Sequence, residues 1–280
     1  MQTKRILTIQ DISCVGQCSL TVALPIISAC GIETAILPAA ILSTHTCGFS
    51  GYTCRDLTED IPPIRKHWQK EQILFDGIYT GYLASAKQIG YVQDVIKTCI
   101  KRNAPVIVDP AMADNGKLYP AFDIDFVSAM KNLCSQADVI LPNITEACFL
   151  TGKEYKSVYN EAYIDTLLSE LAALGAKTIV LTGVGYDDST TGVVVFENGN
   201  KQYYKHKKLP RSCHGTGDVF ASAFVGAYMR GNSFFDSAKA AADFTVECIE
   251  NTPPEHWYGV CFEQYIPVSY THLTLPTNSL

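Results

Sequence analysis

The chain has 280 residues, of which 47% are hydrophobic and 18% charged, a composition typical of a globular protein with a sizeable core. Its 22 basic and 28 acidic residues give a net charge of -6, which argues against nucleic acid or an anionic membrane as the main partner. No segment approaches the roughly 18 apolar residues of a membrane span, and the eleven cysteines include no zinc-type Cys-x-x-Cys pair. The first residues run directly into a strand-like segment, so we expect a cytoplasmic protein.

Strand-like apolar segments alternate with segments of helical spacing along the chain. The expected strands cover residues 6–10, 34–37, 78–83, 105–110, 139–141 and 178–182. The expected helices cover residues 20–30, 86–101, 126–134, 164–174 and 235–250, and a further one begins at residue 143. A hairpin is expected around Asn198-Gly199, a strong turn signal.

This alternation predicts an α/β fold in which helices cover both faces of a mostly parallel central sheet, a three-layer sandwich. No linker or repeat interrupts it, so we expect one domain over residues 1–267. Residues 268–280 have neither helical nor strand periodicity and are expected to form an irregular, poorly packed tail that is foreign to the fold.

Residues Gly215-Thr216-Gly217-Asp218 precede a helix of small apolar residues. Glycines let the backbone N–H groups turn in one direction, and a helix start adds unpaired N–H donors, so the segment is typical of a phosphate site. A carboxylate is repelled by phosphate, but Asp218 belongs there if it takes a proton from a hydroxyl that attacks the phosphate. The alternative is a plain loop that ends in an acidic first turn.

Further polar residues stand at the predicted carboxyl ends of strands, where open α/β sheets bind ligands. They are Asp11, Asp109, Asn143, Glu146 and Thr182. Asp109 and Glu146 could hold Mg²⁺ through water; alternatively, Asp109 only forms a turn and Glu146 only caps the helix that begins at Asn143. A P-loop motif is absent, and no Gly-x-Gly-x-x-Gly follows the first strand, so the phosphates are expected at the 215–217 turn.

These segments resemble those of the pyridoxal/pyridoxamine (vitamin B6) kinases of the ribokinase-like superfamily. Residues 215–218 match its signature, residues 109–114 resemble Asp-Pro-Val-Met-Gly-Asp, and residues 142–146 resemble Pro-Asn-x-x-Glu. Residues 43–46 and 81–83 resemble the vitamin-binding segments Ser-Asn-His-Thr and Gly-Tyr-Leu.

The resemblance runs from about residue 4 to residue 266 and implies a kinase that uses ATP to phosphorylate the 5′-hydroxymethyl group of a B6 vitamer, usually as a homodimer. The implied cofactors are ATP and Mg²⁺, with a monovalent cation as an optional addition. Asp218 would be the base, and the amides of Gly215, Thr216 and Gly217 the anion hole. The nucleotide and metal residues would be Asp109, Asn143 and Glu146, with Thr182 near the nucleotide. The pyridine ring would be held by Asp11 or Ser13, His45, Thr46 and Tyr82.

Two departures bear on the preferred vitamer. Many members have serine where Asp11 stands, and Ala111 and Ala113 replace bulkier or glycine residues. An anion near the ring favours a protonated ring nitrogen or the ammonium of pyridoxamine, so we expect pyridoxamine to be used at least as well as pyridoxal. The alternatives are that Asp11 caps a neighbouring turn, that the substrate is hydroxymethylpyrimidine, and that the protein binds a nucleotide or vitamer without catalysis.

Overall fold

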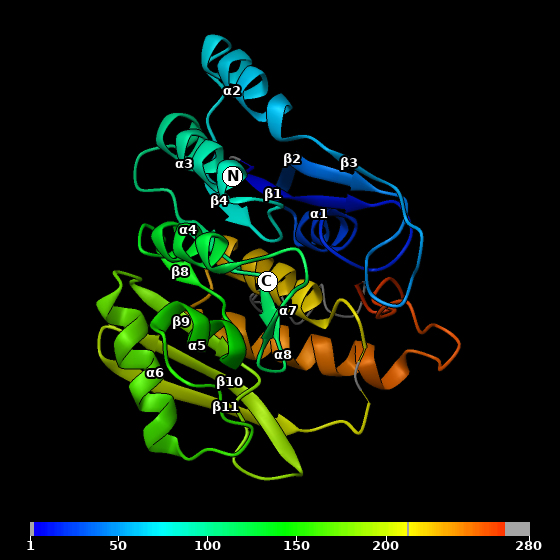
Figure 1. The fold of residues 1–280 in the computed structure, drawn as a ribbon, viewed down its shortest axis with the longest axis vertical. Helices are drawn as coiled ribbons and strands as arrows, with labels where there is room; N and C mark the ends of the chain where they lie inside the picture. The colour runs from blue at the N-terminus through cyan, green and yellow to red at the C-terminus, as the bar shows by residue number, and fades with distance from the viewer. Residues whose placement is uncertain (1–2, 212, 267–280) are drawn as a thin grey trace, which may run out of the picture. The chain divides into compact units, whose positions relative to one another are not determined.

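The computed structural model describes residues 3–211 and 213–266 (Figure 1). Within these residues nine strands belong to one mostly parallel sheet with flanking helices, which confirms the predicted α/β fold. The chain divides into two compact units, residues 58–208 and the two flanking stretches together, so a single kinase domain over residues 1–267 stays a prediction. The expected tail lies outside the described residues.

The unit of residues 58–208 contributes a row of six strands in the order β11-β10-β9-β8-β5-β4. Their bounds are β4 (Gly77–Thr80), β5 (Val106–Val108), β8 (Val139–Ile140), β9 (Thr178–Thr182), β10 (Thr190–Glu197) and β11 (Asn200–Lys207). Strands β4, β5, β8 and β9 are parallel. Strand β10 is antiparallel to β9, and β10 and β11 form the expected antiparallel hairpin. Asn198 and Gly199 both have positive φ at its tip, as their turn signal predicts.

The helices of this unit precede β4 or lie between the strands in the sequence. They are α2 (Ile61–Lys70), α3 (Ala86–Cys99), α4 (Ile124–Cys134), α5 (Ile144–Thr151) and α6 (Glu161–Ala173), with a 3-10 turn (Thr58–Asp60) before α2 and a small hairpin of β6 (Ala113–Asp114) and β7 (Lys117–Leu118) after β5. Helix α2 was not predicted from the sequence, and Ile61 is its one fully buried residue.

The other unit combines the N-terminal and C-terminal stretches of the chain. It contains β1 (Arg5–Ser13), α1 (Leu20–Ala29), β2 (Glu33–Leu42), β3 (Cys54–Asp56), α7 (Thr216–Met229) and α8 (Phe234–Asn251). Strand β2 pairs in parallel with β1 and antiparallel with β3, and the three lie side by side in Figure 1. Helices α1 and α7 pack closely because Gly226 has no side chain: a Cβ there would lie 2.4 Å from the Cys30 Sγ.

Strand β1 continues three residues beyond the expected 6–10. A register shift between Gln10 and Ile12 lets the pairing with β2 resume at Ile12 and Ser13. Asp11 and Ser13 therefore lie within the last residues of the strand, beyond the end that the apolar pattern predicts. None of the described helices has the length and apolarity needed to cross a membrane.

Candidate functional site

The predicted site residues form two clusters, one in each unit. The carboxylate cluster consists of Asp109, Asn143, Glu146 and Thr182 in the unit of residues 58–208. The glycine-turn cluster consists of Asp11, Ser13, His45 and the turn Gly215–Asp218 in the other unit.

Helix α5 begins in the carboxylate cluster at a reciprocal hydrogen-bond pair. The Asn143 side chain accepts from the Glu146 N–H, and the Glu146 carboxylate accepts from the Asn143 N–H, each at 2.9 Å. This confirms the capping box expected from the sequence. The other carboxylate oxygen of Glu146 accepts from the N–H groups of Met112 and Ala113 at 3.0 and 3.5 Å. The buried Glu146 side chain therefore also holds the segment that follows β5.

Asp109 follows β5 directly, and its N–H donates to the Thr80 carbonyl oxygen at the end of β4 at 2.9 Å. Its carboxylate accepts from the Ala111 N–H at 3.1 Å, as expected of a turn former. Ala111 has a φ of 27°, a region that residues with a Cβ rarely adopt. Asp109 thus holds a strained turn at the carboxyl end of β5.

Neither Asp109 nor Glu146 forms an ion pair with a basic side chain in the part of the chain that the structure describes. Burial raises the pKa of Glu146, and burial together with the charge of Glu146 raises the pKa of Asp109 well above its usual range. This donor set fits a hard divalent cation, which takes carboxylate oxygens and would relieve the repulsion. Among residues 3–211 and 213–266, no group of three or more His, Cys, Asp or Glu could hold a metal ion. Water or phosphate oxygens would therefore have to complete the coordination.

The remaining residues of this unit lie at neighbouring strand ends. Thr182, the last residue of β9, donates its N–H to the Pro142 carbonyl oxygen at 2.9 Å and forms a bridge with Asn143. The Asn143 side chain donates to the Ala113 carbonyl oxygen at 2.8 Å. Asp109, Asn143 and Thr182 thus share the carboxyl edge of β5, β8 and β9, as the sequence predicts. Tyr82 follows β4, and its ring centroid lies 5.3 Å from that of Phe122.

The glycine-turn cluster is centred on the first residue before helix α7. Gly215 has a φ of 78°, and a Cβ there would lie 1.8 Å from the Gln17 carbonyl oxygen, so only glycine fits. The N–H groups of the following first turn have no acceptor within the helix, and the helix dipole favours an anion beside them. Asp218 stands in that same first turn. The backbone thus combines anion-binding donors with one carboxylate.

Asp11 is 5% exposed and accepts a hydrogen bond from the Ser13 hydroxyl at 3.2 Å. Burial raises its pKa, and hydrogen bonds from Ser19 and Ser13 partly offset this rise. Burial also raises the pKa of the Cys18 thiol, and the charges of Asp218 and Asp11 raise it further. Asp11 and Asp218 therefore both lie near the Cys18 thiol within this unit.

His45 is 4% exposed, and both of its ring nitrogens have protein partners. Nδ1 accepts from the Cys47 N–H at 3.1 Å, so Nε2 carries the proton and donates it to the Tyr258 carbonyl oxygen at 2.6 Å. The ring also lies 5.7 Å from that of His214, beside the glycine turn. Thr46, the next residue, is exposed.

The sequence did not single out the segment of residues 256–258, which the structure brings to His45. Besides the Tyr258 carbonyl, it supplies the half-exposed Trp257, whose ring lies 4.8 Å from that of Phe49. Phe49 in turn lies 5.1 Å from the His45 ring. Three consecutive aromatic residues near the end of the chain are the signal that could have drawn attention to this segment.

Comparisons with known proteins identify relatives along most of the chain. The model of the phosphomethylpyrimidine kinase family matches residues 62–260. A hydroxymethylpyrimidine/phosphomethylpyrimidine kinase of Aquifex aeolicus is 27% identical over 190 residues, which cover 65% of this chain and 70% of the relative.

Two solved structures resemble the chain over nearly its full length. The pyridoxal kinase of Lactobacillus plantarum has a TM-score of 0.89 at 31% identity and covers 96% of this chain and 97% of its own. A Bacteroides thetaiotaomicron protein assigned to the phosphomethylpyrimidine kinases and crystallised with pyridoxal has a TM-score of 0.89 at 34% identity, with coverage of 99% and 98%.

Proposed function

Because this chain belongs to the phosphomethylpyrimidine kinase family, we propose that it is a vitamin B6 kinase. It would transfer the γ-phosphate of ATP to the 5′-hydroxymethyl group of pyridoxamine, pyridoxal or pyridoxine. One similar structure is a pyridoxal kinase, and another contains pyridoxal, which supports this choice of substrate. A cytoplasmic location and a homodimer accompany the proposal as predictions.

The observation that carries the proposal is the start of helix α7. A left-handed Gly215 turns the backbone so that the first N–H groups of the helix have no acceptor within it, and Asp218 stands in the first turn. We assign the amides of Gly215, Thr216 and Gly217 to the phosphate oxygens of the transition state. Asp218 would accept the proton of the vitamer hydroxyl as that oxygen attacks.

We assign Asp109 and Glu146 to Mg²⁺, which when bound neutralises charge on the phosphates. Asn143 and Thr182 would contact the nucleotide, together with Asp109. The support for this assignment is the desolvated, mutually repelling carboxylate pair at the edge that also carries Asn143 and Thr182.

The vitamer ring is assigned to Asp11, Ser13, Thr46 and Tyr82. Asp11 is buried and retains the capacity to accept further hydrogen bonds, since a carboxylate offers about four acceptor positions. His45 stays in the predicted set, although both of its ring nitrogens already bond to protein atoms. Its contribution would therefore come through the segments that it holds together.

Hydroxymethylpyrimidine kinase is the second candidate, and the Aquifex aeolicus relative favours it. The acceptor is again a hydroxymethyl group on a flat nitrogen heterocycle, so the same base and anion hole would serve. A binding protein without catalysis is a third class, but binding alone does not require a carboxylate beside a phosphate site.

The test is ADP release by the purified protein with ATP and Mg²⁺. Pyridoxal, pyridoxamine, pyridoxine and hydroxymethylpyrimidine are offered separately, with ATP alone as the blank. Turnover with any B6 vitamer above that with the pyrimidine supports the proposal. Turnover with the pyrimidine alone selects the second candidate, and no turnover with any acceptor overturns the assignment of a kinase.

A further inference from the structure

The turn Gly183-Val184-Gly185 follows Thr182 at the carboxyl end of β9. Gly183 has a φ of 73°, and a Cβ added to it would have nothing within 4 Å. Its N–H has no acceptor among the described residues. Two glycines within three residues give this turn little intrinsic order, because glycine has the largest backbone entropy to lose. Something outside the turn must therefore hold it.

The Tyr159 hydroxyl bridges the two ends of the turn. It accepts a hydrogen bond from the Gly185 N–H at 3.0 Å and donates to the Gly183 carbonyl oxygen at 3.4 Å. A hydroxyl has one proton to donate, and here both its proton and a lone pair are used on the turn. Tyr159 is itself placed by the start of α6, because the next residue, Asn160, caps that helix by accepting from the Tyr163 N–H at 3.1 Å.

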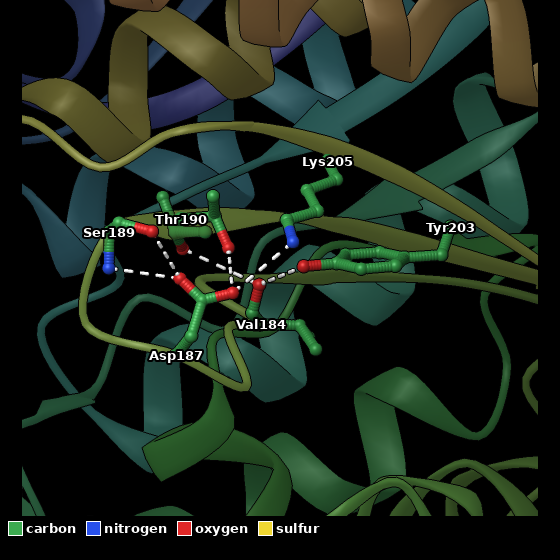
Figure 2. A network of polar contacts seen from close by, with 7 residues as sticks. Val184, Asp187, Ser189, Thr190, Tyr203 and Lys205 are labelled. Carbon is green, nitrogen blue, oxygen red and sulfur yellow. Dashed lines mark hydrogen bonds and ion pairs between the residues drawn. The ribbon is translucent and has the colours of Figure 1, made fainter.

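A second tyrosine holds the middle of the turn, as Figure 2 shows. The Tyr203 hydroxyl on β11 donates to the Val184 carbonyl oxygen at 2.9 Å, while the Val184 N–H donates to the Gly192 carbonyl oxygen at 3.0 Å. Every residue of the turn is thus bonded from outside, and two of the three are bonded by Tyr159.

Just beyond the turn, the Asp187 carboxylate holds the loop that leads into β10 (Figure 2). One carboxylate oxygen accepts from the Ser189 N–H and hydroxyl at 2.9 and 2.7 Å, and the other accepts from the Thr190 hydroxyl and Lys205 Nζ at 2.6 and 3.2 Å. These contacts, first among them the Thr190 hydroxyl, lower the pKa of Asp187. The loop is therefore anchored on both sides of Tyr186.

We propose that Tyr159 is a positioning residue for the nucleotide: it holds the Gly183–Gly185 turn so that the Gly183 N–H is ordered before an acceptor atom of a nucleoside di- or triphosphate arrives. The inference rests on the proposed function, which assigns the adjacent Thr182 to the nucleotide. Ordering the glycines during folding removes that entropy loss from the binding step, which is how preorganisation strengthens binding.

The test is the affinity of the purified protein for ADP with Mg²⁺, measured by calorimetry for wild type, Tyr159→Phe and Tyr186→Phe. Tyr186 is the matched control, since its ring lies 6.1 Å from that of Tyr159 but its hydroxyl has no hydrogen-bond partner among the described residues. We expect Tyr159→Phe to bind ADP about two- to tenfold more weakly, the size of a lost neutral hydrogen bond. It should raise KM for ATP by the same factor, with KM for the vitamer unchanged, and Tyr186→Phe should match wild type.

The remaining outcomes separate this inference from the function on which it rests. If wild type binds ADP and Tyr159→Phe binds it equally well, the positioning role is wrong and the kinase assignment stands. Equal weakening by Tyr159→Phe and Tyr186→Phe would mean general loss of packing and would also overturn the role. If wild type does not bind ADP at all, both are overturned. Amide hydrogen exchange at residues 183–185 supplies a second readout, which should accelerate in Tyr159→Phe and not in Tyr186→Phe.

Discussion

The imidazole of His45 donates from Nε2 to the carbonyl oxygen of Tyr258 at 2.6 Å, a contact between residues 213 positions apart in the chain. The same ring accepts from the Cys47 N–H and lies against Gly16, where a Cβ would come within 2.1 Å of its Cδ2. One neutral imidazole thus joins three segments of the unit that contains the glycine turn. Its burial and double hydrogen bonding explain a histidine here without contact to a substrate.

Replacing His45 with phenylalanine should therefore destabilise the protein. The buried contact is lost, and the Cys47 N–H and the Tyr258 carbonyl are left without this partner, at about 1–3 kcal/mol for each group that water cannot reach. His45→Gln is the matched variant, because its amide can still donate and accept. Urea unfolding should show a lower free energy of unfolding for phenylalanine than for glutamine. Equal stability of wild type and His45→Phe would show that the ring does not hold these segments.

Asp218→Asn keeps the shape of the first turn of α7 but cannot take up the proton of the attacking hydroxyl. We expect kcat to fall by roughly 10²–10⁴ with little change in vitamer affinity. Asp236→Asn is the control, since Asp236 is also an acid in the first turn of a helix, α8. Steady-state kinetics on both variants make the comparison, and near-normal turnover of Asp218→Asn would remove Asp218 from the mechanism.

Asp11→Ser should change the preferred vitamer. Charge-assisted hydrogen bonds contribute about 1.5–3 kcal/mol and neutral ones about 0.5–1.5, so the carboxylate should favour pyridoxamine over pyridoxal by up to about tenfold. We expect kcat/KM for pyridoxamine to equal or exceed that for pyridoxal in wild type and the order to reverse in Asp11→Ser. Ser13→Ala is a useful comparison, because it removes the hydroxyl bonded to Asp11 and leaves the charge. An unchanged order in Asp11→Ser would place the carboxylate outside vitamer recognition.

The stability of the metal-free protein should depend on pH through Glu146. Burial raises its pKa from 4.5 to about 7. A raised folded-state pKa means that folding favours the protonated form, so this stability is fully present below the unfolded pKa and is lost as pH rises through the folded one. The melting temperature should therefore fall between about pH 4.5 and pH 7. Glu146→Gln, which removes the charge and leaves one side-chain oxygen to accept from a backbone N–H, should reduce this fall. If the melting temperature fell as steeply with pH in Glu146→Gln as in wild type, the pH dependence could not be assigned to Glu146.

Mg²⁺ should reverse this loss of stability. A cation binds the deprotonated carboxylates, so the rise in melting temperature on adding Mg²⁺ should be larger at pH 8 than at pH 5.5. Asp109→Asn should abolish most of the rise, and Asp114→Asn, which changes an exposed neighbouring acid, should retain it. A rise that is independent of pH in wild type would argue that Mg²⁺ binds elsewhere.

Local patterns predicted the parts of the structure that depend on local physics. The capping box at Asn143 and Glu146 formed because both partners lie within one helical turn. The turn at Asn198-Gly199 formed because these residues tolerate positive φ. Strand ends brought Asp109, Asn143 and Thr182 to one edge because parallel strands place their carboxyl ends together.

Contacts between distant segments could not be predicted in the same way. The partner of His45 is a backbone carbonyl, which carries no mark in the sequence. Tyr159 acts through its hydroxyl on glycines 24 and 26 positions further along. The extension of β1 depends on a register shift against β2, which the apolar pattern of β1 alone does not encode.

The close packing of α1 against α7 has a consequence for how the protein is made. During synthesis the chain emerges from its N-terminus, and residues 58–208 separate the first stretch of this unit from the second. The Lys4 Nζ donates to the Met229 carbonyl oxygen at 2.6 Å, and this contact can form only after the residue 225 positions downstream has been synthesised. We expect the unit of residues 58–208 to fold first during synthesis, because all of its segments emerge consecutively from the ribosome. Until α7 emerges, we expect the face of α1 that packs against α7 to stay exposed and to be available for binding by chaperones.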